Sequence, residues 1–248
     1  MKKLVVITGA GSGIGEATAL LASQKGWTPV LLGRRLEKLQ AVEVKCSIPA
    51  YSIPCDLSQS RDIEQALQKI LAIPNSSLIG LVNNAGIFLR HGPTENGLEP
   101  WRKQFETNLF GHIQLTQGLI PIFQEQKQGS IVNVSSTLGL RPTAGVSAYS
   151  ASKAAMNSWA QSLALELGKD HIRVNCVCPG LVDTPIHAFH DLKNDEKIKA
   201  LENMKDLQPL GRIGNPEDIA KSIIFLLGED SSWTTGAILS VDGGINLT

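Results

Sequence analysis

The feature that most constrains the fold is a glycine-rich turn directly after the first apolar segment. Residues 4–8 read LVVIT and lead into GAGSGIG at residues 9–15, after which an apolar pattern of helical period begins. Glycines allow the chain to turn sharply and let backbone N–H groups approach a phosphate, whose charge the N-terminus of the following helix favours. The spacing is G-x-x-x-G-x-G, because Ile14 stands where G-x-G-x-x-G needs its last glycine. Its position after an apolar strand predicts a strand–turn–helix unit of the kind that binds nucleotides.

Short apolar runs alternate with longer segments of helical period along the chain, without a polar linker between them. Strands are expected at residues 4–8, 29–32, 51–55, 79–83, 130–134, 172–178 and 237–241. Helices are expected at residues 14–25, 35–44, 60–71, about 100–125, 148–167 and 216–227. Several strands are apolar at consecutive positions, as in a parallel sheet that is covered on both faces. The pattern predicts one α/β domain over residues 1–248, a doubly wound Rossmann-type three-layer sandwich with a parallel, seven-stranded sheet.

Prolines add detail to this expected fold. Pro54 cannot donate to a strand ladder, which predicts that the third strand lies at the edge of the sheet. Residues 184–212 are polar and charged, contain Pro185 and Pro209 near their ends, and interrupt the alternation of strands and helices. A long irregular insertion in a compact fold is often a lid, so we expect a substrate loop there, with a solvated helix over residues 193–205.

The composition excludes several classes of protein. The chain has 248 residues with 23 basic and 23 acidic side chains, and a net charge of zero argues against a nucleic-acid or anionic-membrane partner. Four cysteines are too few for a disulfide scaffold, and Cys176 and Cys178 are expected to be buried thiols in a reducing compartment. The lysines and apolar residues at the N-terminus resemble a signal peptide, but glycines and Glu16 interrupt that stretch. No segment approaches the ~18 uninterrupted apolar residues of a membrane span, so we expect a soluble, cytoplasmic protein.

The end of the second predicted strand bears on which dinucleotide could bind. NAD-binding folds usually place an acidic residue about 20 residues beyond the glycine turn, where it binds the ribose hydroxyls. From residue 17 to residue 36 the chain has no acidic residue, and the second strand ends in Gly33-Arg34-Arg35. Arg34 is therefore interpreted as a clamp for the 2′-phosphate of NADP, with a basic surface turn as the alternative.

One tyrosine has the spacing of an acid–base catalyst. Of the two tyrosines only Tyr149 has a lysine four residues on, Lys153, and on a helix this spacing brings both side chains to one face. A phenol with a pKa near 10 is a poor catalyst at neutral pH, and a nearby ammonium group favours the phenolate. The alternative is an ordinary surface pair. Ser136, which follows a predicted strand 13 residues before Tyr149, and the glycine turn favour the catalytic interpretation.

These motifs together resemble the short-chain dehydrogenase/reductase family, in its single-domain form of about 250 residues. The resemblance covers essentially the whole chain. Its motifs are, in order, Thr8-Gly9-x-x-x-Gly13-Ile14-Gly15, Asp56-Leu57, Asn83-Asn84-Ala85-Gly86, Asn108, Ser135-Ser136, Tyr149-x-x-x-Lys153, Pro179-Gly180 with Thr184, and Asp242-Gly243-Gly244. Each motif is modest alone, but their order and spacing are specific to the family.

The resemblance implies a role for each of four catalytic residues. Tyr149 is expected to be the general acid in ketone reduction and the base in alcohol oxidation. Ser136 is expected to hydrogen-bond the substrate oxygen, and the 13-residue gap to Tyr149 favours it over Ser135. Lys153 is expected to bind the nicotinamide ribose and to lower the pKa of Tyr149, while Asn108 is expected to hold a water molecule of the proton relay.

The resemblance also implies a cofactor site. Asp56 is expected to face the adenine ring, Asn83 to lie beside the cofactor and brace the sheet, and Thr184 to contact the nicotinamide carboxamide. The other cofactor-binding residues expected are Gly9, Ser12, Gly13, Ile14, Gly15, Arg34, Leu57, Ala85, Gly86, Tyr149, Lys153, Pro179, Gly180 and Val182. Most of these residues follow predicted strands, so they should share the carboxyl edge of one parallel sheet, where such folds bind ligands.

The expected function is hydride transfer between a nicotinamide cofactor, NADP(H) rather than NAD(H), and a small-molecule ketone, aldehyde or secondary alcohol. An enoyl reductase is one alternative, although relatives with that activity usually have a longer spacing than the three residues between Tyr149 and Lys153. A catalytically silent binding protein is the other, and the presence of all four catalytic residues argues against it. Leu138, Leu140, Ile186 and Phe189 suggest a partly apolar pocket, which leaves sugars, steroids, acyl thioesters and aromatic ketones open as substrates.

No metal ion is expected to take part. His187 and His190 lie near Asp191, but a zinc site needs at least three ligands in fixed geometry, so both are interpreted as loop histidines near the substrate entrance. The long helices predicted at about 100–125 and 148–167 suggest contacts between subunits, because the second is rich in small residues. Family members commonly assemble through these helices, so a homotetramer is expected, with a dimer next.

Overall fold

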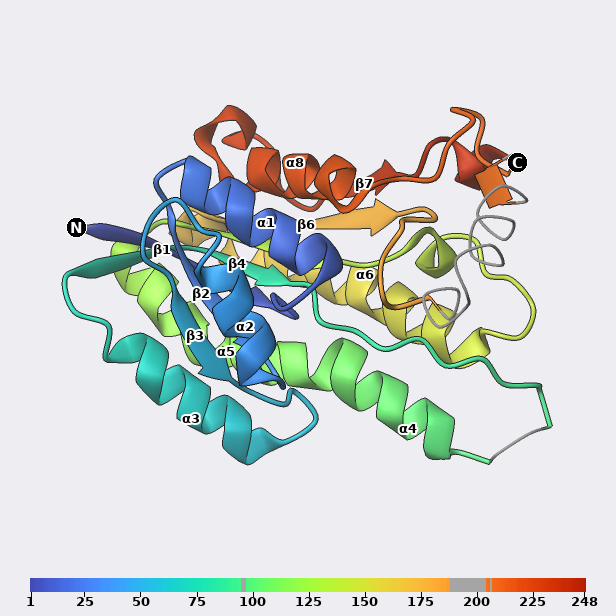
Figure 1. Cartoon of the computed structure of the whole chain (residues 1–248), viewed down its shortest axis with the longest axis horizontal. Helices are drawn as coiled ribbons and strands as arrows, with labels where there is room; N and C mark the ends of the chain where they lie inside the picture. The colour runs from blue at the N-terminus through green and yellow to red at the C-terminus, as the bar shows by residue number, and fades with distance from the viewer. Residues whose placement is uncertain (95–96, 188–203, 206) are drawn as a thin grey trace.

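The strands form a parallel sheet (Figure 1). The structure, a computed structural model, describes residues 1–94, 97–187, 204–205 and 207–248. The strands are β1 (Lys2–Thr8), β2 (Thr28–Gly33), β3 (Tyr51–Pro54), β4 (Ser76–Asn83), β5 (Gly129–Val134), β6 (Ile172–Pro179) and β7 (Ile238–Val241). They lie side by side in the order β3-β2-β1-β4-β5-β6-β7. The chain winds outward from β1 in one direction and then from β4 in the other, so the predicted doubly wound, seven-stranded sheet is confirmed.

Helices cover both faces of this sheet. They are α1 (Gly13–Gln24), α2 (Leu36–Glu43), α3 (Ser60–Leu71), α4 (Glu99–Phe105), α5 (Gly111–Gln126), α6 (Ser147–Leu167) and α8 (Pro216–Leu227). Buried side chains of α3, α5 and α6 form one core cluster with the sheet, and those of α1, α2 and α8 form a second cluster on the opposite face. In β1, Val6 belongs to the first cluster and its neighbours Val5 and Ile7 to the second, because side chains alternate along a strand. Consecutive apolar residues in the strands are therefore buried because both faces are covered.

The edge of the sheet lies where Pro54 predicts it. β3 is the outermost strand next to β2, and Pro54 at its end stands opposite Gly33. A proline at this position removes no hydrogen bond from the interior of the sheet. Within the described ranges, no helix is both long and apolar enough to cross a membrane.

One predicted helix contains an irregular turn that matters for the site. The single helix predicted over about residues 100–125 is present, because the chain is helical without a break from Glu99 to Gln126, with α4 ending at Phe105 and α5 beginning at Gly111. Between them Glu106–Phe110 form one turn of π-helix, here called the π-turn, in which an extra residue changes the direction of the side chains. Gly111 lies so close to the loop after β3 that a Cβ atom there would be 2.1 Å from the Leu57 carbonyl oxygen. The π-turn carries Asn108, which is fully buried.

The substrate loop predicted at residues 184–212 is described only in part. Residues 188–203 and 206 lie outside the described residues, and with them His190, Asp191 and most of the helix predicted over 193–205. Thr184 is buried and approaches the glycine turn, since a Cβ atom on Gly13 would be 3.1 Å from the Thr184 Cγ2 atom. This contact joins the start of the loop to the start of α1.

Candidate active site

The turn after β1 has the shape of a phosphate-binding cradle. Gly9 and Gly13 have positive φ angles of 64° and 55°, a conformation that other residues rarely adopt. Gly15 has no room for a side chain, because a Cβ atom there would be 2.3 Å from the Gly9 carbonyl oxygen. α1 begins at Gly13, and Ser12 before it makes no side-chain capping hydrogen bond to the first N–H groups of the helix. Those N–H groups and the helix N-terminus can together bind a phosphate.

Thr8 and Asn84, to which the motifs assign no role, hold this turn against the end of β4. The Thr8 hydroxyl accepts hydrogen bonds from the backbone N–H groups of Asn84 at 2.8 Å and Ala85 at 2.9 Å. The Asn84 side chain donates to the Thr8 carbonyl oxygen at 2.8 Å. The sequence signals were their places in two of the family motifs and at the ends of apolar strands. No local pattern could reveal a pairing between residues 76 positions apart.

Asn108 fixes the loop that follows β4. Its Oδ1 atom accepts a hydrogen bond from the Ile87 N–H at 2.8 Å, and its Nδ2 atom donates to the Ile87 carbonyl oxygen at 3.0 Å. Nδ2 also donates to the Ser152 hydroxyl of α6 at 3.2 Å. Asn108 therefore connects the loop after β4 with the helix that carries Tyr149 and Lys153.

The two adjacent serines after β5 have different surroundings. Ser135 donates its hydroxyl hydrogen to the Lys153 carbonyl oxygen at 3.1 Å, which ties the end of β5 to α6. Ser136 accepts a hydrogen bond from the Leu138 N–H at 3.1 Å and shares a side-chain hydrogen bond with Tyr149. Of the two serines, Ser136 is thus the one that meets the phenol.

Tyr149 and Lys153 are buried on one face of α6, with 7% and 3% of their surface exposed. The Lys153 Nζ atom lies 5.8 Å from the centre of the Tyr149 ring and donates to the Val134 carbonyl oxygen at 2.8 Å. Burial raises the pKa of Tyr149 to about 12, and the hydrogen bond with Ser136 partly opposes that rise. Burial also lowers the pKa of Lys153 to about 8. The net shift of the Tyr149 pKa in the protein alone is therefore upward, opposite in direction to the lowering expected from Lys153.

The loop after β4 meets this group of residues at Gly86. A Cβ atom on Gly86 would lie 3.3 Å from the Asn108 Oδ1 atom and 3.7 Å from the Lys153 Nζ atom. Lys153 faces Tyr149, and Tyr149 is hydrogen-bonded to Ser136. The structure thus brings together the four residues that the family resemblance singles out for catalysis.

Phe88, an aromatic residue outside the motifs, packs against Tyr149. The two rings meet edge to face, with their centres 4.8 Å apart. On its other side, the Phe88 ring lies 6.1 Å from the ring of His187. A lone aromatic residue in a loop carries no periodic signal, so the sequence could not identify Phe88. Among the described residues, no three His, Cys, Asp or Glu side chains come together in a way that could hold a metal ion.

Two expected cofactor residues make hydrogen bonds within the protein. Asn83 is fully buried, and its Nδ2 atom donates to the Thr116 hydroxyl at 3.0 Å and to the Asn133 Oδ1 atom at 2.8 Å. It braces β4 against β5 and α5, as expected, and its side chain lies inside the fold. Asp56 accepts hydrogen bonds from the Ser58 N–H at 2.9 Å and hydroxyl at 2.8 Å, which shapes the loop after β3.

Ile14, Leu57 and Ala85 contribute their side chains to the cores. Ile14 packs against the cluster on the α1 face, while Leu57 belongs to the cluster on the α5 face and Ala85 packs against that cluster. Since these side chains point into the protein, the main-chain atoms of the three residues are the groups that could bind a cofactor.

A basic hollow of about 360 Å³ lies beside the glycine turn. Its lining residues are Gly11, Ser12, Glu16, Arg35, Lys38, Ala41, Val42, Lys45 and Pro185. Arg34 is exposed at the end of β2 and does not line this hollow, whereas its neighbour Arg35 does. Lys45 forms an ion pair with Glu16 at 2.7 Å. Arg35 and Lys38 are therefore candidate partners of a phosphate, in addition to Arg34.

The segment after β6 closes the site on the other side of the turn. Gly180 lies against the residue that follows β7, since a Cβ atom on Gly180 would be 2.8 Å from the Asp242 Cα atom. Val182 pairs with Gly214 in an isolated parallel bridge. These contacts lead the chain from the end of β6 to Thr184 beside the glycine turn.

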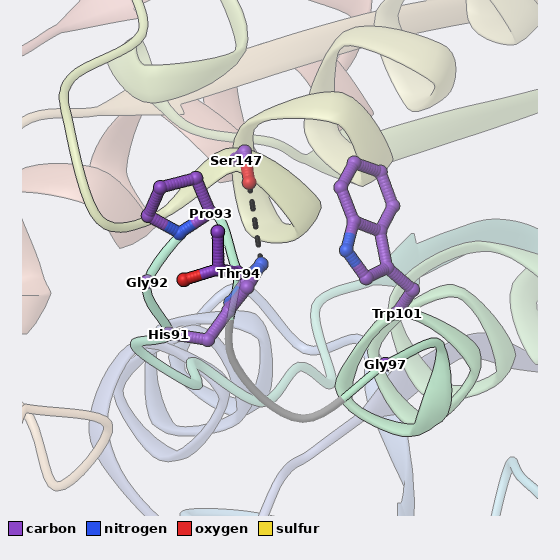
Figure 2. A pocket seen from close by; sticks show the side chains of 7 residues that line it. All are labelled: His91, Gly92, Pro93, Thr94, Gly97, Trp101 and Ser147. Atoms are coloured by element: carbon purple, nitrogen blue, oxygen red, sulfur yellow. Dashed lines mark hydrogen bonds between the residues drawn. The ribbon is translucent and has the colours of Figure 1, made fainter.

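A smaller hollow of about 150 Å³ lies between the loop after β4, α4 and the start of α6 (Figure 2). It is lined by His91, Gly92, Pro93, Thr94, Gly97, Trp101 and Ser147. The His91 Nε2 atom lies 3.2 Å from the Ser147 hydroxyl, and the His91 ring meets Trp101 edge to face at 6.0 Å. Because Ser147 begins α6, this contact ties the loop to the helix that carries Tyr149.

Comparison with known proteins identifies relatives over the full chain. A family model described as "Enoyl-(Acyl carrier protein) reductase" matches residues 9–246. The chain is 37% identical over 248 residues to the 3-oxoacyl-[acyl-carrier-protein] reductase FabG of Thermotoga maritima, covering 98% of this chain and 97% of the relative. It is 35% identical over 249 residues to the 3-oxoacyl-[acyl-carrier-protein] reductase of Bos taurus, covering 100% of each.

A solved structure shows the same architecture. The crystal structure of 3-ketoacyl-(acyl-carrier-protein) reductase from Brucella melitensis, complexed with NADH, has a TM-score of 0.88 to this chain at 30% sequence identity, covering 98% of each chain. Fold, motifs and relatives agree along the whole sequence. The chain therefore belongs to the short-chain dehydrogenase/reductase family and is an oxidoreductase that transfers a hydride between a nicotinamide cofactor and a carbonyl or alcohol group.

Proposed function

We propose that the protein is an NADPH-dependent reductase of 3-oxoacyl thioesters. The observation that carries this proposal is the similarity to two 3-oxoacyl-[acyl-carrier-protein] reductases over nearly the whole length of both chains, at 37% and 35% identity. The spacing of three residues between Tyr149 and Lys153 supports reduction of a carbonyl group over reduction of a C=C bond. The apolar contact of Phe88 with Tyr149 suits an acyl chain beside the reacting carbon.

The residues of the site fit a nicotinamide dinucleotide. The positive φ angles of Gly9 and Gly13 and the free N-terminus of α1 form a cradle for its diphosphate. Gly33 offers no carboxylate to repel a 2′-phosphate, and Arg34 and Arg35 follow it directly, which supports NADP(H) over NAD(H). When bound, the cofactor supplies the hydride.

The protein's own part in the reaction is to polarise the carbonyl group and deliver a proton. Tyr149, whose pKa burial raises to about 12, is protonated at neutral pH, as an unshifted phenol would be, and can donate its hydrogen to the substrate oxygen. Ser136, which is hydrogen-bonded to Tyr149, orients the same oxygen. The charge of Lys153 stabilises the phenolate that remains, and Asn108 holds the water molecule through which Tyr149 regains its proton.

A direct assay tests this proposal. Purified protein with NADPH is expected to reduce a short 3-oxoacyl thioester such as acetoacetyl-coenzyme A, which is followed by the loss of NADPH absorbance. The 2-enoyl thioester of the same length is the matched control and is expected to react far more slowly. Faster turnover of the enoyl thioester would contradict carbonyl chemistry. Faster turnover of a steroid, a sugar or an aromatic ketone would contradict the substrate class alone.

We further propose that the protein assembles as a homotetramer, with a dimer as the next alternative. The small residues that favour helix contacts along α6 are Ala151, Ala154, Ala155, Ser158 and Ala160. Ala154 and Ser158 are exposed one turn apart, as such a contact requires, whereas Ala160 is buried against the sheet and takes no part. Leu165 on the same helix is 87% exposed, and Phe110 beside α5 is 49% exposed. An apolar side chain this exposed is typical of a surface that another chain covers.

Light scattering measures the assembly directly. At micromolar concentration we expect the mass of a tetramer, because apolar side chains are exposed at a second place, near the C-terminus, where Trp233 is 99% exposed. Replacing Leu165 with glutamate should reduce the mass by weakening the contact along α6. A monomer at this concentration would contradict the proposal.

We also propose a cytoplasmic location. The four cysteines, Cys46, Cys55, Cys176 and Cys178, are all free thiols. Burial raises the pKa of Cys55 to about 12 and also raises the pKa of Cys176 and Cys178. These thiols are therefore protonated and unreactive, as expected of buried cysteines in a reducing compartment.

A further inference from the structure

The first residues of the loop after β4, 84–87, are held by three side chains from different elements. The Thr8 hydroxyl accepts a hydrogen bond from the Ala85 N–H at 2.9 Å, and Asn108 bonds both backbone groups of Ile87 at 2.8 and 3.0 Å. The third side chain is His112 of α5, whose Nε2 atom lies 2.8 Å from the Ala85 carbonyl oxygen. No motif or expected role includes His112.

His112 is the middle member of a row of three polar side chains that begins in the π-turn and continues along α5. Asn108 holds Ile87, His112 holds Ala85, and Thr116 holds Asn83. The row advances by four residues of helix, about 6 Å, while its partners advance by two residues of extended chain, about 6.6 Å, so the two spacings match. The helix and the segment from Asn83 to Ile87 run in opposite directions. The π-turn at Glu106–Phe110 places the first member of this row in register with the others.

The environment of His112 makes it a permanent hydrogen-bond donor. A carbonyl oxygen can only accept, so the Nε2 atom carries the hydrogen that it shares with Ala85. His112 has no exposed surface, and burial lowers its pKa to about 3, with the charge of Lys153 acting in the same direction. The ring is therefore neutral throughout the physiological pH range. It cannot exchange protons with the substrate there, so its contribution must come from the hydrogen bond.

The choice of histidine itself indicates a function for this bond. Among the described residues the Nδ1 atom of His112 has no hydrogen-bond partner although it is buried. Burying a polar nitrogen without a partner is unfavourable, so a purely apolar side chain would pack at lower cost. The hydrogen bond that His112 donates to the Ala85 carbonyl oxygen must offset the cost of burying Nδ1.

The position of Gly86 depends on this bond. Gly86 follows Ala85 directly, and a Cβ atom on it would lie 3.3 Å from the Asn108 Oδ1 atom and 3.7 Å from the Lys153 Nζ atom. Turning the Ala85–Gly86 peptide would move the main chain toward or away from both groups. We propose that His112 is a positioning residue for cofactor binding, which holds Gly86 at the distance from Asn108 and Lys153 that the dinucleotide requires. This inference rests on the proposed function only in taking NADPH as the ligand.

Two variants and one control test the inference. H112F keeps a ring but removes the donor, while H112Q restores a donor, since the glutamine Nε2 atom is as many bonds from Cα as the histidine Nε2 atom. The control is Q126M at the far end of α5, because Gln126 also bonds β4 backbone, at the Leu78 N–H (3.1 Å) and carbonyl oxygen (3.0 Å). The measurements are the Kd of NADPH by fluorescence titration and the urea midpoint of unfolding without cofactor.

We expect H112F to raise the Kd of NADPH about 10-fold, as the loss of one buried hydrogen bond predicts, and H112Q to restore most of the affinity. Q126M should lower the urea midpoint and leave the Kd unchanged. If H112F lowers only the urea midpoint, or if H112Q binds as weakly as H112F, the positioning role is wrong. If H112F does not fold, H112L takes its place in the same comparison. A wild-type protein that binds neither NADPH nor NADH would instead overturn the proposed cofactor, and this role with it.

Discussion

Replacing Tyr149 with phenylalanine is expected to lower kcat by about 10²–10⁴-fold, the contribution of a positioned proton donor. The change keeps the ring and its edge-to-face contact with Phe88 and removes only the hydroxyl group that meets Ser136. The free energy of unfolding and the Kd of NADPH should therefore change little. Steady-state kinetics on the substrate of the wild-type enzyme, together with a cofactor titration, measure both expectations.

Tyr51 provides the matched control, because it is the other tyrosine of the chain and lies in β3 at the edge of the sheet. Tyr51→Phe should leave kcat unchanged. The direction of the reaction gives a further check, since alcohol oxidation needs the phenolate of Tyr149, whose pKa burial raises to about 12. Oxidation by the wild type should accelerate as the pH rises, and this acceleration should vanish in Tyr149→Phe. Turnover at the wild-type rate in the phenylalanine variant would refute the role of Tyr149.

Truncating Arg34 to alanine should weaken NADPH binding by about 10- to 150-fold and leave NADH binding nearly unchanged. A charge-assisted hydrogen bond contributes about 1.5–3 kcal/mol, and about 1.4 kcal/mol corresponds to a tenfold change in affinity. Gly33 before Arg34 supplies no carboxylate, so the ribose hydroxyls of NADH gain nothing at this position. Titration of both cofactors against the wild type and the variant measures the difference.

Arg35→Ala is the informative comparison for Arg34→Ala. Arg35 lines the hollow beside Ser12 and Arg34 does not, so a larger effect at Arg35 would move the phosphate contact by one residue. Added salt should weaken NADPH binding more than NADH binding in the wild type, because the extra interaction is electrostatic and partly exposed. Equal or tighter binding of NADH by the wild type would show that the preference for NADP(H) is wrong.

Much of the fold could be predicted because its signals are local. Consecutive apolar residues in β1 indicate burial on both faces, and Pro54 indicates an edge strand, because each follows from the chemistry of one strand. The glycine turn at residues 9–15 is likewise a local signal, because the positive φ angles at two of its positions favour glycine. The i, i+4 spacing of Tyr149 and Lys153 needs only a helix to bring the two side chains to one face.

The sequence did not reveal the features that depend on contacts between distant segments. The expected helix over residues 100–125 forms, but its π-helical segment at Glu106–Phe110 and the close approach of Gly111 to the backbone at Leu57 depend on the tertiary structure. The contact between Arg35 and the hollow beside Ser12 depends on how α2 lies against the glycine turn, which its sequence does not specify.

The sequence by itself therefore determined the family and the sheet and predicts the reacting side chains, since turn chemistry, strand burial and helical spacing are local properties. Only the tertiary structure decided how those side chains are held. The bonds of Thr8 to Ala85 and of His112 to Ala85 join elements far apart in the chain. The rise in the pKa of Tyr149 was decided in the same way, because it depends on how completely the folded protein removes the phenol from water.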